Sequence, residues 1–224
     1  MTSGVKPLQS EGEHNDELTA GRHRADRSTG QGEECDAMLI LSMGVTVDGF
    51  INDRNGAFDW PGFTDEQFRF QTAQVAELGG YLCGRRLYET MLPWETDRSM
   101  RDSELGATFA DIWCALPKVV FSRTLDSVEG NARLATAPVA EEIAAALEST
   151  DRDISIGGPT LAAPAIELDL VDELLLFRFP MVVGGGTPLL PTVAENRPFA
   201  LVDTRTFGSS VVYEQYRRDR TPAN

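Results

Sequence analysis

Short apolar runs alternate with helical segments along most of this chain, and this alternation limits the fold more than any other feature. The runs MLILSMGV at 38–45 and KVVF at 118–121 have the length of buried strands. Strands that alternate with helices are typical of α/β domains, in which crossover helices join parallel strands. We therefore predict a single α/β domain with a mostly parallel central sheet, flanking helices and an antiparallel C-terminal hairpin.

The apolar periodicity and the turn residues give approximate bounds for each element. Strands are predicted at 38–47, 80–84, 118–122, 132–136, 153–156, 171–183, 199–207 and 209–216. Helices are predicted at 65–80, 85–93, 109–117, 138–150 and 159–170. Thr64 is the expected N-cap of the first helix, with Asp65 and Glu66 in its first turn.

The first 36 residues differ in composition from the rest. They are polar and contain few large apolar groups, so we predict a disordered tail at 1–36 and an ordered domain at 37–220. A misassigned start codon or a solubilising extension explains such a tail as well as a function does. The N-terminus has no apolar signal region, and no run of 18 apolar residues occurs, which predicts a cytoplasmic protein.

The charge and the histidine count narrow the function. The formal net charge of -15 argues against partnership with nucleic acid or an anionic membrane surface. The chain has 2 histidines, His14 and His23, and both lie in the polar tail. Histidine-based triads and the common zinc sites are therefore not expected in the domain, and 3 scattered cysteines suggest no metal site either.

Three predicted strands end in residues that suit an anion. Gly84-Arg85-Arg86 follows one strand, Ser122-Arg123 follows the next, and Gly157-Gly158-Pro159-Thr160 follows a third. Ligands of open α/β sheets bind beyond the carboxyl ends of the strands, where arginine forks and glycine turns accept phosphates. Each motif alone is weak, since an arginine pair is usually a solvated surface and a glycine pair is usually a turn. Their order along the chain favours a ligand with several phosphates.

These pieces, taken together, resemble one known family. The segments SMGVTVDGFI, YLCGRRLYE, PKVVFSRTL, SIGGPTLAAPAIELDLVDELLLFRFPMVVGGGTPLL and the terminal hairpin are similar to the dihydrofolate reductase superfamily. Within it, the chain resembles stand-alone proteins similar to the C-terminal reductase domain of bifunctional riboflavin biosynthesis proteins. The resemblance spans about 38–218 and implies a dihydrofolate reductase-like fold.

The resemblance also implies NADPH as the cofactor, bound across the strand ends. Ser122 and Arg123 match a pair that binds the adenosine 2′-phosphate, and the loop at 184–190 matches one beside the active site. The other implied cofactor contacts are Val45, Gly84, Arg85, Arg86, Leu87, Gly157, Gly158, Pro159, Thr160 and Leu161. Leu87 replaces a hydroxyl residue of the folate reductases, so one phosphate contact would come from the backbone alone.

The sequence identifies the proton donor less specifically than the cofactor site. In folate reductases a carboxylate near the start of the first helix touches the pterin, and Asp65 or Glu66 falls at that place. Both residues are explained equally well as helix N-terminal acids. Asp48 is the second candidate, although Asp48-Gly49 is also an ordinary turn pair. Water remains the third source.

The resulting expectation is an NADPH-dependent reductase that transfers hydride to a C=N or C=O bond of a small heterocyclic substrate. Two alternatives stay open: the riboflavin-pathway 5-amino-6-(5-phosphoribosylamino)uracil reductase, and a non-catalytic nucleotide-binding protein of the same fold. The chain carries no deaminase motif. The resemblance further implies a homodimer.

Overall fold

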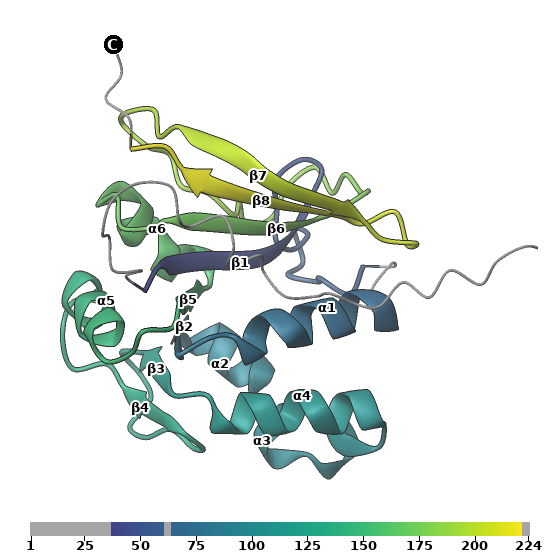
Figure 1. The fold of residues 1–224 in the computed structure, drawn as a ribbon, viewed down its shortest axis with the longest axis vertical. Coiled ribbons are helices and arrows are strands. Elements are labelled where there is room, and N and C mark those ends of the chain that lie inside the picture. The colour runs from purple at the N-terminus through teal and green to yellow at the C-terminus, as the bar shows by residue number, and fades with distance from the viewer. Residues whose placement is uncertain (1–36, 61–63, 221–224) are drawn as a thin grey trace, which may run out of the picture.

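The protein is built on one eight-stranded sheet, seen edge-on in Figure 1. The structure, a computed structural model, describes residues 37–60 and 64–220, so the predicted tail at 1–36 lies outside the described residues. The strands follow the order β4-β3-β2-β5-β1-β6-β8-β7. Their bounds are β1 Leu39–Thr46, β2 Gly80–Gly84, β3 Lys118–Phe121, β4 Ala132–Leu134, β5 Ile154–Gly157, β6 Glu173–Phe179, β7 Phe199–Thr206 and β8 Val212–Arg218.

The strands from β4 to β6 run parallel, and β8 and β7 close the sheet as an antiparallel hairpin. The predicted α/β class, with its antiparallel C-terminal hairpin, is therefore confirmed. Helices and one 3-10 helix, η2, connect the parallel strands. They are α1 Asp65–Ala76, α2 Arg85–Met91, α3 Pro93–Thr96, η2 Arg98–Arg101, α4 Glu104–Ala115, α5 Val139–Glu148 and α6 Pro159–Glu167.

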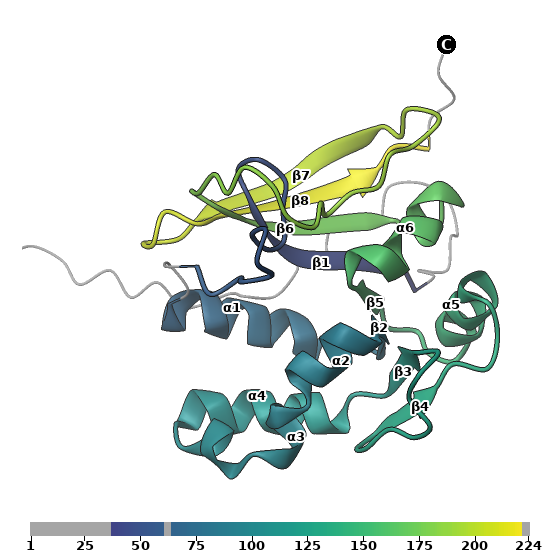
Figure 2. The same ribbon diagram turned by 180° about the vertical axis from the view of Figure 1, so that it is seen from behind.

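Alternate residues of the central strands pack on opposite faces of the sheet. Leu39 and Leu41 of β1 join a core with residues of α5 and α6, whereas Ile40 joins the face that Phe70 of α1 covers. Helix α4 packs against α1 on the side away from the sheet. Helices α5 and α6, which cover the other face, are seen in Figure 2. The sheet is thus covered by helices on both faces, which leaves its carboxyl edge as the place where loops gather.

Several sequence predictions were wrong in detail. The helix predicted at 65–80 ends at Ala76, and Gly80 is the first residue of β2. The strand predicted at 171–183 ends at Phe179, because Pro180 has no N–H with which to continue the ladder. The helix predicted at 109–117 begins at Glu104, where Ser103 caps it by accepting the N–H of Gly106. Helices α3 and η2 were not predicted. The N-cap at Thr64 is confirmed, since its hydroxyl accepts the N–H of Gln67 at 3.4 Å.

A buried lysine connects α3 and α4 to the sheet. The Lys118 side chain of β3 is 0% exposed, and its ammonium lies 3.2 Å from a carboxylate oxygen of Glu95 on α3. The ammonium also donates to the carbonyls of Trp113 at 2.6 Å and Leu116 at 2.8 Å. Three acceptors match its three N–H groups, so this buried charge is fully compensated.

Glu142 of α5 holds the segment after β4 in the same manner. Its side chain, 3% exposed, pairs with Arg133 at 2.5 Å and accepts the N–H groups of Thr136 at 2.7 Å and Ala137 at 3.1 Å. The Arg133 guanidinium first, and then these backbone hydrogen bonds, lower the pKa of Glu142 from 4.5 to about 2. The carboxyl group of Glu142 is therefore ionised in the folded protein at neutral pH.

Replacement of Glu142 by glutamine should make the protein less sensitive to acid. The lowered pKa contributes stability above pH 4.5 that is lost as the pH falls toward 2. Allowing for screening of the half-exposed Arg133, the contribution at pH 7 is about 2 kcal/mol. Between pH 7 and pH 3, urea unfolding should show a smaller loss of stability in Glu142→Gln than in the wild type, because Asp48 and Glu66 still contribute to the loss in both. The exposed neighbour Glu141→Gln is the control, and an unaltered pH dependence in Glu142→Gln would contradict the assignment.

Candidate active site

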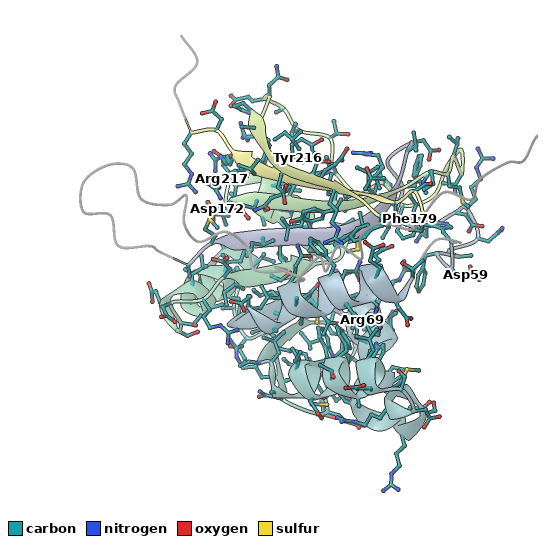
Figure 3. The ribbon with its side chains drawn as sticks, turned by 45° about the vertical axis from the view of Figure 1, so that its right-hand side comes forward. Asp59, Arg69, Asp172, Phe179, Tyr216 and Arg217 are labelled. Atoms are coloured by element: carbon teal, nitrogen blue, oxygen red, sulfur yellow. The ribbon has the colours of Figure 1, made fainter. Side chains whose placement is uncertain are left out.

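The carboxyl edge of the parallel strands brings most of the predicted site residues to one side of the sheet. Strands β3, β2, β5 and β1 are consecutive neighbours, so the segments that follow them lie next to one another. Figure 3 shows Phe179, the last residue of β6, at this end of the molecule near Asp59, whereas Asp172 lies at the other end. The ring of Trp60 packs on Phe179 with a centroid distance of 5.3 Å. An aromatic pair therefore borders the edge.

Of the two adjacent arginines after β2, only Arg85 has an ionic partner among the described residues. Arg85 forms an exposed i,i+4 ion pair with Glu89 at 3.2 Å. Arg86 has no carboxylate partner among the described residues, and it lines a hollow that also includes the loops at 52–56 and 186–187. Leu87 packs inward against Cys83 and Tyr88. Of this motif, Arg86 is thus the side chain available to an anion, while Leu87 is a packing residue.

The end of β3 presents one free cation on a fixed turn. The hydroxyl of Ser122 accepts the N–H groups of Thr124 at 3.1 Å and Leu125 at 3.0 Å, which shapes the turn. Arg123 is exposed and has no hydrogen-bonding or ionic partner in the described part of the chain. The serine therefore fixes the backbone from which the guanidinium of Arg123 reaches into solvent.

The two glycines after β5 are required for different physical reasons. A Cβ on Gly157 would lie 2.3 Å from Leu87 Cδ2 and 2.6 Å from Tyr81 Oη, so close packing excludes a side chain there. Gly158 has φ 94° and open space where its Cβ would be, which leaves its backbone accessible to a ligand.

Helix α6 begins directly after these glycines. Pro159 is at its first turn and Thr160 is exposed beside it. Leu161, by contrast, is buried in the core between the sheet and α6, so its side chain does not face the edge. Gly158 and Thr160 are consequently the parts of this motif that a ligand can reach.

The loop after β1 is joined to the loop after β6. Asp48 accepts the hydroxyl of Thr46 at 2.7 Å and the N–H of Gly184 at 2.8 Å, and it also accepts the N–H of Val183. These hydrogen bonds, with Thr46 contributing most, lower the pKa of Asp48. Val45, just before, is buried in the core, which leaves only its backbone to face the edge.

Backbone hydrogen bonds extend this junction along both loops. Val47 donates to Met181 at 3.0 Å, Ile51 donates to Thr187 at 2.9 Å, and Leu189 donates to Gly49 at 3.0 Å. The contact is close, because a Cβ on Gly186 would lie 2.0 Å from the carbonyl oxygen of Asn52. We call residues 46–54 and 181–189 together the paired loops.

The acids at the start of α1 do not converge with Asp48. Glu66 pairs with Arg205 of β7 at 2.8 Å and accepts the N–H of Gly208 at 3.2 Å, and these contacts lower its pKa, Arg205 first. The side chain of Asp65 is 82% exposed and lies 3.8 Å from Arg69. Acids that are held ionised are poor proton donors, so Asp48 and Glu66 fit positioning roles better than proton transfer. The catalytic assignment of all three residues stays a prediction.

Sequence reasoning missed Arg54. Its guanidinium donates to the carbonyl of Gly184 and lines the same hollow as Arg86. The segment Asp53-Arg54-Asn55-Gly56 forms a turn, in which Asp53 accepts the N–H of Asn55 at 2.8 Å. An arginine in the loop that follows the first strand was the available signal, but only the fold places it in the same hollow as Arg86.

The described residues contain neither a cluster of metal ligands nor a membrane-spanning helix. No group of three histidine, cysteine or acidic side chains between 37 and 220, omitting 61–63, is arranged to hold a metal ion. Within the same residues no helix is long and apolar enough to span a bilayer.

Comparisons with known proteins agree with this geometry. A family model described as the RibD C-terminal domain matches residues 37–213. The uncharacterized protein YyaP of Bacillus subtilis (strain 168) is 32% identical over 188 residues, which cover 80% of this chain and 93% of YyaP. The resemblance to reductase domains of this type is thereby confirmed.

Solved structures share the fold at lower identity. A putative riboflavin biosynthesis protein from Shewanella sp. PV-4 superimposes with a TM-score of 0.65 at 24% identity, covering 82% of this chain and 99% of its own. Dihydrofolate reductase from Enterococcus faecalis, complexed with NADP(H), gives a TM-score of 0.54 at 18% identity and covers 81% and 96%. The dihydrofolate reductase-like fold predicted from the sequence is confirmed.

Proposed function

The chain belongs to the RibD C-terminal domain family, and from this premise we propose that it is an NADPH-dependent reductase of a small heterocyclic substrate. The observation that carries the proposal is the set of free arginines at the carboxyl edge. Arg86 and Arg123 lack carboxylate partners among the described residues, although the chain has a formal net charge of -15. Unpaired arginines in an acidic protein are the expected partners of a multiply charged anion.

The residues at the edge fit NADPH. Arg123 would hold the 2′-phosphate, Arg86 would hold the pyrophosphate, and the open backbone at Gly158 would let the cofactor approach the sheet. When bound, NADPH supplies a hydride for a C=N or C=O bond. The Trp60–Phe179 pair would exclude water beside a planar substrate. With Asp48 and Glu66 held ionised, we propose that water delivers the proton to the reduced bond.

The test is a titration of the full-length protein with NADPH and with NADH at low ionic strength. Tryptophan fluorescence is the readout, because Trp60 borders the edge. We expect saturable binding of NADPH and at least tenfold weaker binding of NADH. A panel of heterocyclic imines and carbonyl compounds then tests turnover through NADPH oxidation. Absence of NADPH binding would overturn the proposal, and binding without turnover across the panel would favour the non-catalytic alternative.

A second candidate is the riboflavin-pathway reductase. Its support is a structural neighbour, the diaminohydroxyphosphoribosylaminopyrimidine deaminase/5-amino-6-(5-phosphoribosylamino)uracil reductase of Thermotoga maritima, with a TM-score of 0.58 at 19% identity. This chain covers 57% of that protein. Expression in a bacterial strain that lacks the pathway reductase decides the matter, since growth without added riboflavin would favour this candidate over a different heterocycle.

We also propose that the protein forms a homodimer through the hairpin edge of the sheet. β7 is the last strand on that side, and its Leu201 and Val202 are 55% and 46% exposed. Light scattering coupled to size exclusion should give the mass of a dimer, and Leu201→Lys should shift the population toward monomer by charging the edge. A monomeric wild type at micromolar concentration would contradict this proposal.

A further inference from the structure

The hollow beside Arg86 has two arginines on different elements. It has a volume of about 480 Å³ and is open to solvent on one side. Arg86 comes from the first turn of α2, and Arg54 comes from the turn that follows β1. The remaining lining residues are Asn52, Asp53, Asn55, Gly56, Gly186 and Thr187. Two cations from different elements therefore line one space.

The wall that carries Arg54 is held in place before any ligand arrives. Asp53 Oδ1 accepts the N–H groups of Asn55 at 2.8 Å and Ala57 at 2.9 Å, which closes the turn. The Asn52 side chain accepts the N–H of Thr187 at 2.8 Å, and Arg54 donates to the carbonyl of Gly184. A guanidinium has five N–H donors, so this single contact leaves most of its donors available.

The charge of the hollow is not neutralised by its own residues. Asp53 is its one acidic lining residue, and that carboxylate already accepts two backbone N–H groups. Arg54 and Arg86 form no ion pair with any described carboxylate, whereas Arg85 next door is paired with Glu89. Only three other described arginines lack such a pair, and they are Arg98, Arg123 and Arg152. The two unpaired arginines therefore leave positive charge in the hollow that is available to an anion.

We propose that Arg54 and Arg86 clamp a phosphate group between the paired loops and α2. Phosphate fits because two planar guanidinium forks can share its oxygens, and because the backbone at Gly186 adds no side chain to the wall. Arg54 thereby becomes a binding residue that the paired loops contribute to the site. The phosphate belongs either to the cofactor's pyrophosphate or to a phosphorylated substrate. The assignment rests on the proposed function for its ligand, while the anion site itself stands on the two arginines.

Inorganic pyrophosphate is the first probe, measured by calorimetry and by the shift in melting temperature at low ionic strength. The variants are Arg54→Gln and Arg86→Gln, which change different elements, so a local loop rearrangement cannot explain the same loss in both. The control is Arg98→Gln, an equally unpaired arginine in η2 that does not line the hollow. We expect the dissociation constant to rise about tenfold or more in each hollow variant and to stay within twofold in the control.

NADPH titration of the same variants identifies the source of the phosphate. A parallel loss of NADPH affinity in Arg54→Gln assigns the clamp to the cofactor. Unchanged NADPH affinity with lost pyrophosphate binding assigns it to a phosphorylated substrate. Wild-type protein that binds no pyrophosphate, or hollow variants that bind it as the wild type does, would overturn the clamp. Pyrophosphate binding that depends on Arg54, in a protein without NADPH affinity, would instead overturn the proposed cofactor and leave the clamp standing.

Discussion

Replacement of Arg123 by glutamine should weaken NADPH binding by about 10- to 100-fold and leave NADH binding unchanged. The guanidinium is exposed, unpaired among the described residues and carried on the turn that Ser122 fixes. A charge-assisted contact with a phosphate is worth about 1.5–3 kcal/mol, and only the 2′-phosphate distinguishes the two cofactors. Fluorescence titration of both cofactors, with the wild type and the variant, measures the difference.

The control for Arg123 separates a specific contact from the field of the whole protein. Arg98→Gln removes the same charge from η2, away from the strand ends, and should alter neither affinity. If both variants weaken NADPH equally, the effect is one of net charge and not of a bound 2′-phosphate. If Arg123→Gln weakens NADPH and NADH alike, Arg123 contacts a group that both cofactors share, and the assignment to the adenosine end is wrong.

Replacement of Lys118 by methionine should lower the free energy of unfolding by about 3–5 kcal/mol. The change leaves the carboxylate of Glu95, whose side chain is 6% exposed, without its ammonium partner. It also removes the hydrogen bonds to the carbonyls of Trp113 and Leu116. Urea unfolding at pH 7, followed by tryptophan fluorescence, reports the loss directly, because Trp113 lies under the ammonium at 5.0 Å.

The double variant Lys118→Met/Glu95→Met provides the matched comparison. Removing both charges avoids the uncompensated carboxylate, so the double variant should be more stable than Lys118→Met alone. It should still fall short of the wild type, because the two carbonyls lose their donor. A single variant that unfolds at nearly the wild-type urea concentration would mean that Glu95 turns outward to solvent and that the buried pair contributes little.

Much of the fold was accessible from local sequence. The runs MLILSMGV and KVVF and the N-cap at Thr64 each indicate their own element, and β1, β3 and the start of α1 lie where these signals put them. Helix α3 and η2 were missed because four-residue helices have no room for an apolar period. Pro180 was the signal that β6 ends at Phe179, but the apolar residues after it obscured that signal.

The site was less accessible, because its contacts join residues far apart in the chain. Arg86 and Arg123 could be proposed from their place after strands. Leu87 and Leu161 could not be separated from ligand contacts by sequence alone, since their packing is visible only when the helices lie on the sheet. Glu66 looked like a free acid at a helix start, yet Arg205 of β7 reaches it from 139 positions away. Arg54 likewise gains its place only through the loop after β6.

The hydrogen bonds between residues 46–54 and 181–189 have a consequence for engineering and for divergence within the family. Ile51, Thr187 and Gly186 fit one another at backbone distance, so neither segment has a free choice of length or path. Exchanging one of them for the counterpart from a relative would leave backbone donors and acceptors of the other segment without partners. Substrate range should therefore be transferable between relatives only when both segments are exchanged together. Natural insertions in one segment should be accompanied by changes in the other.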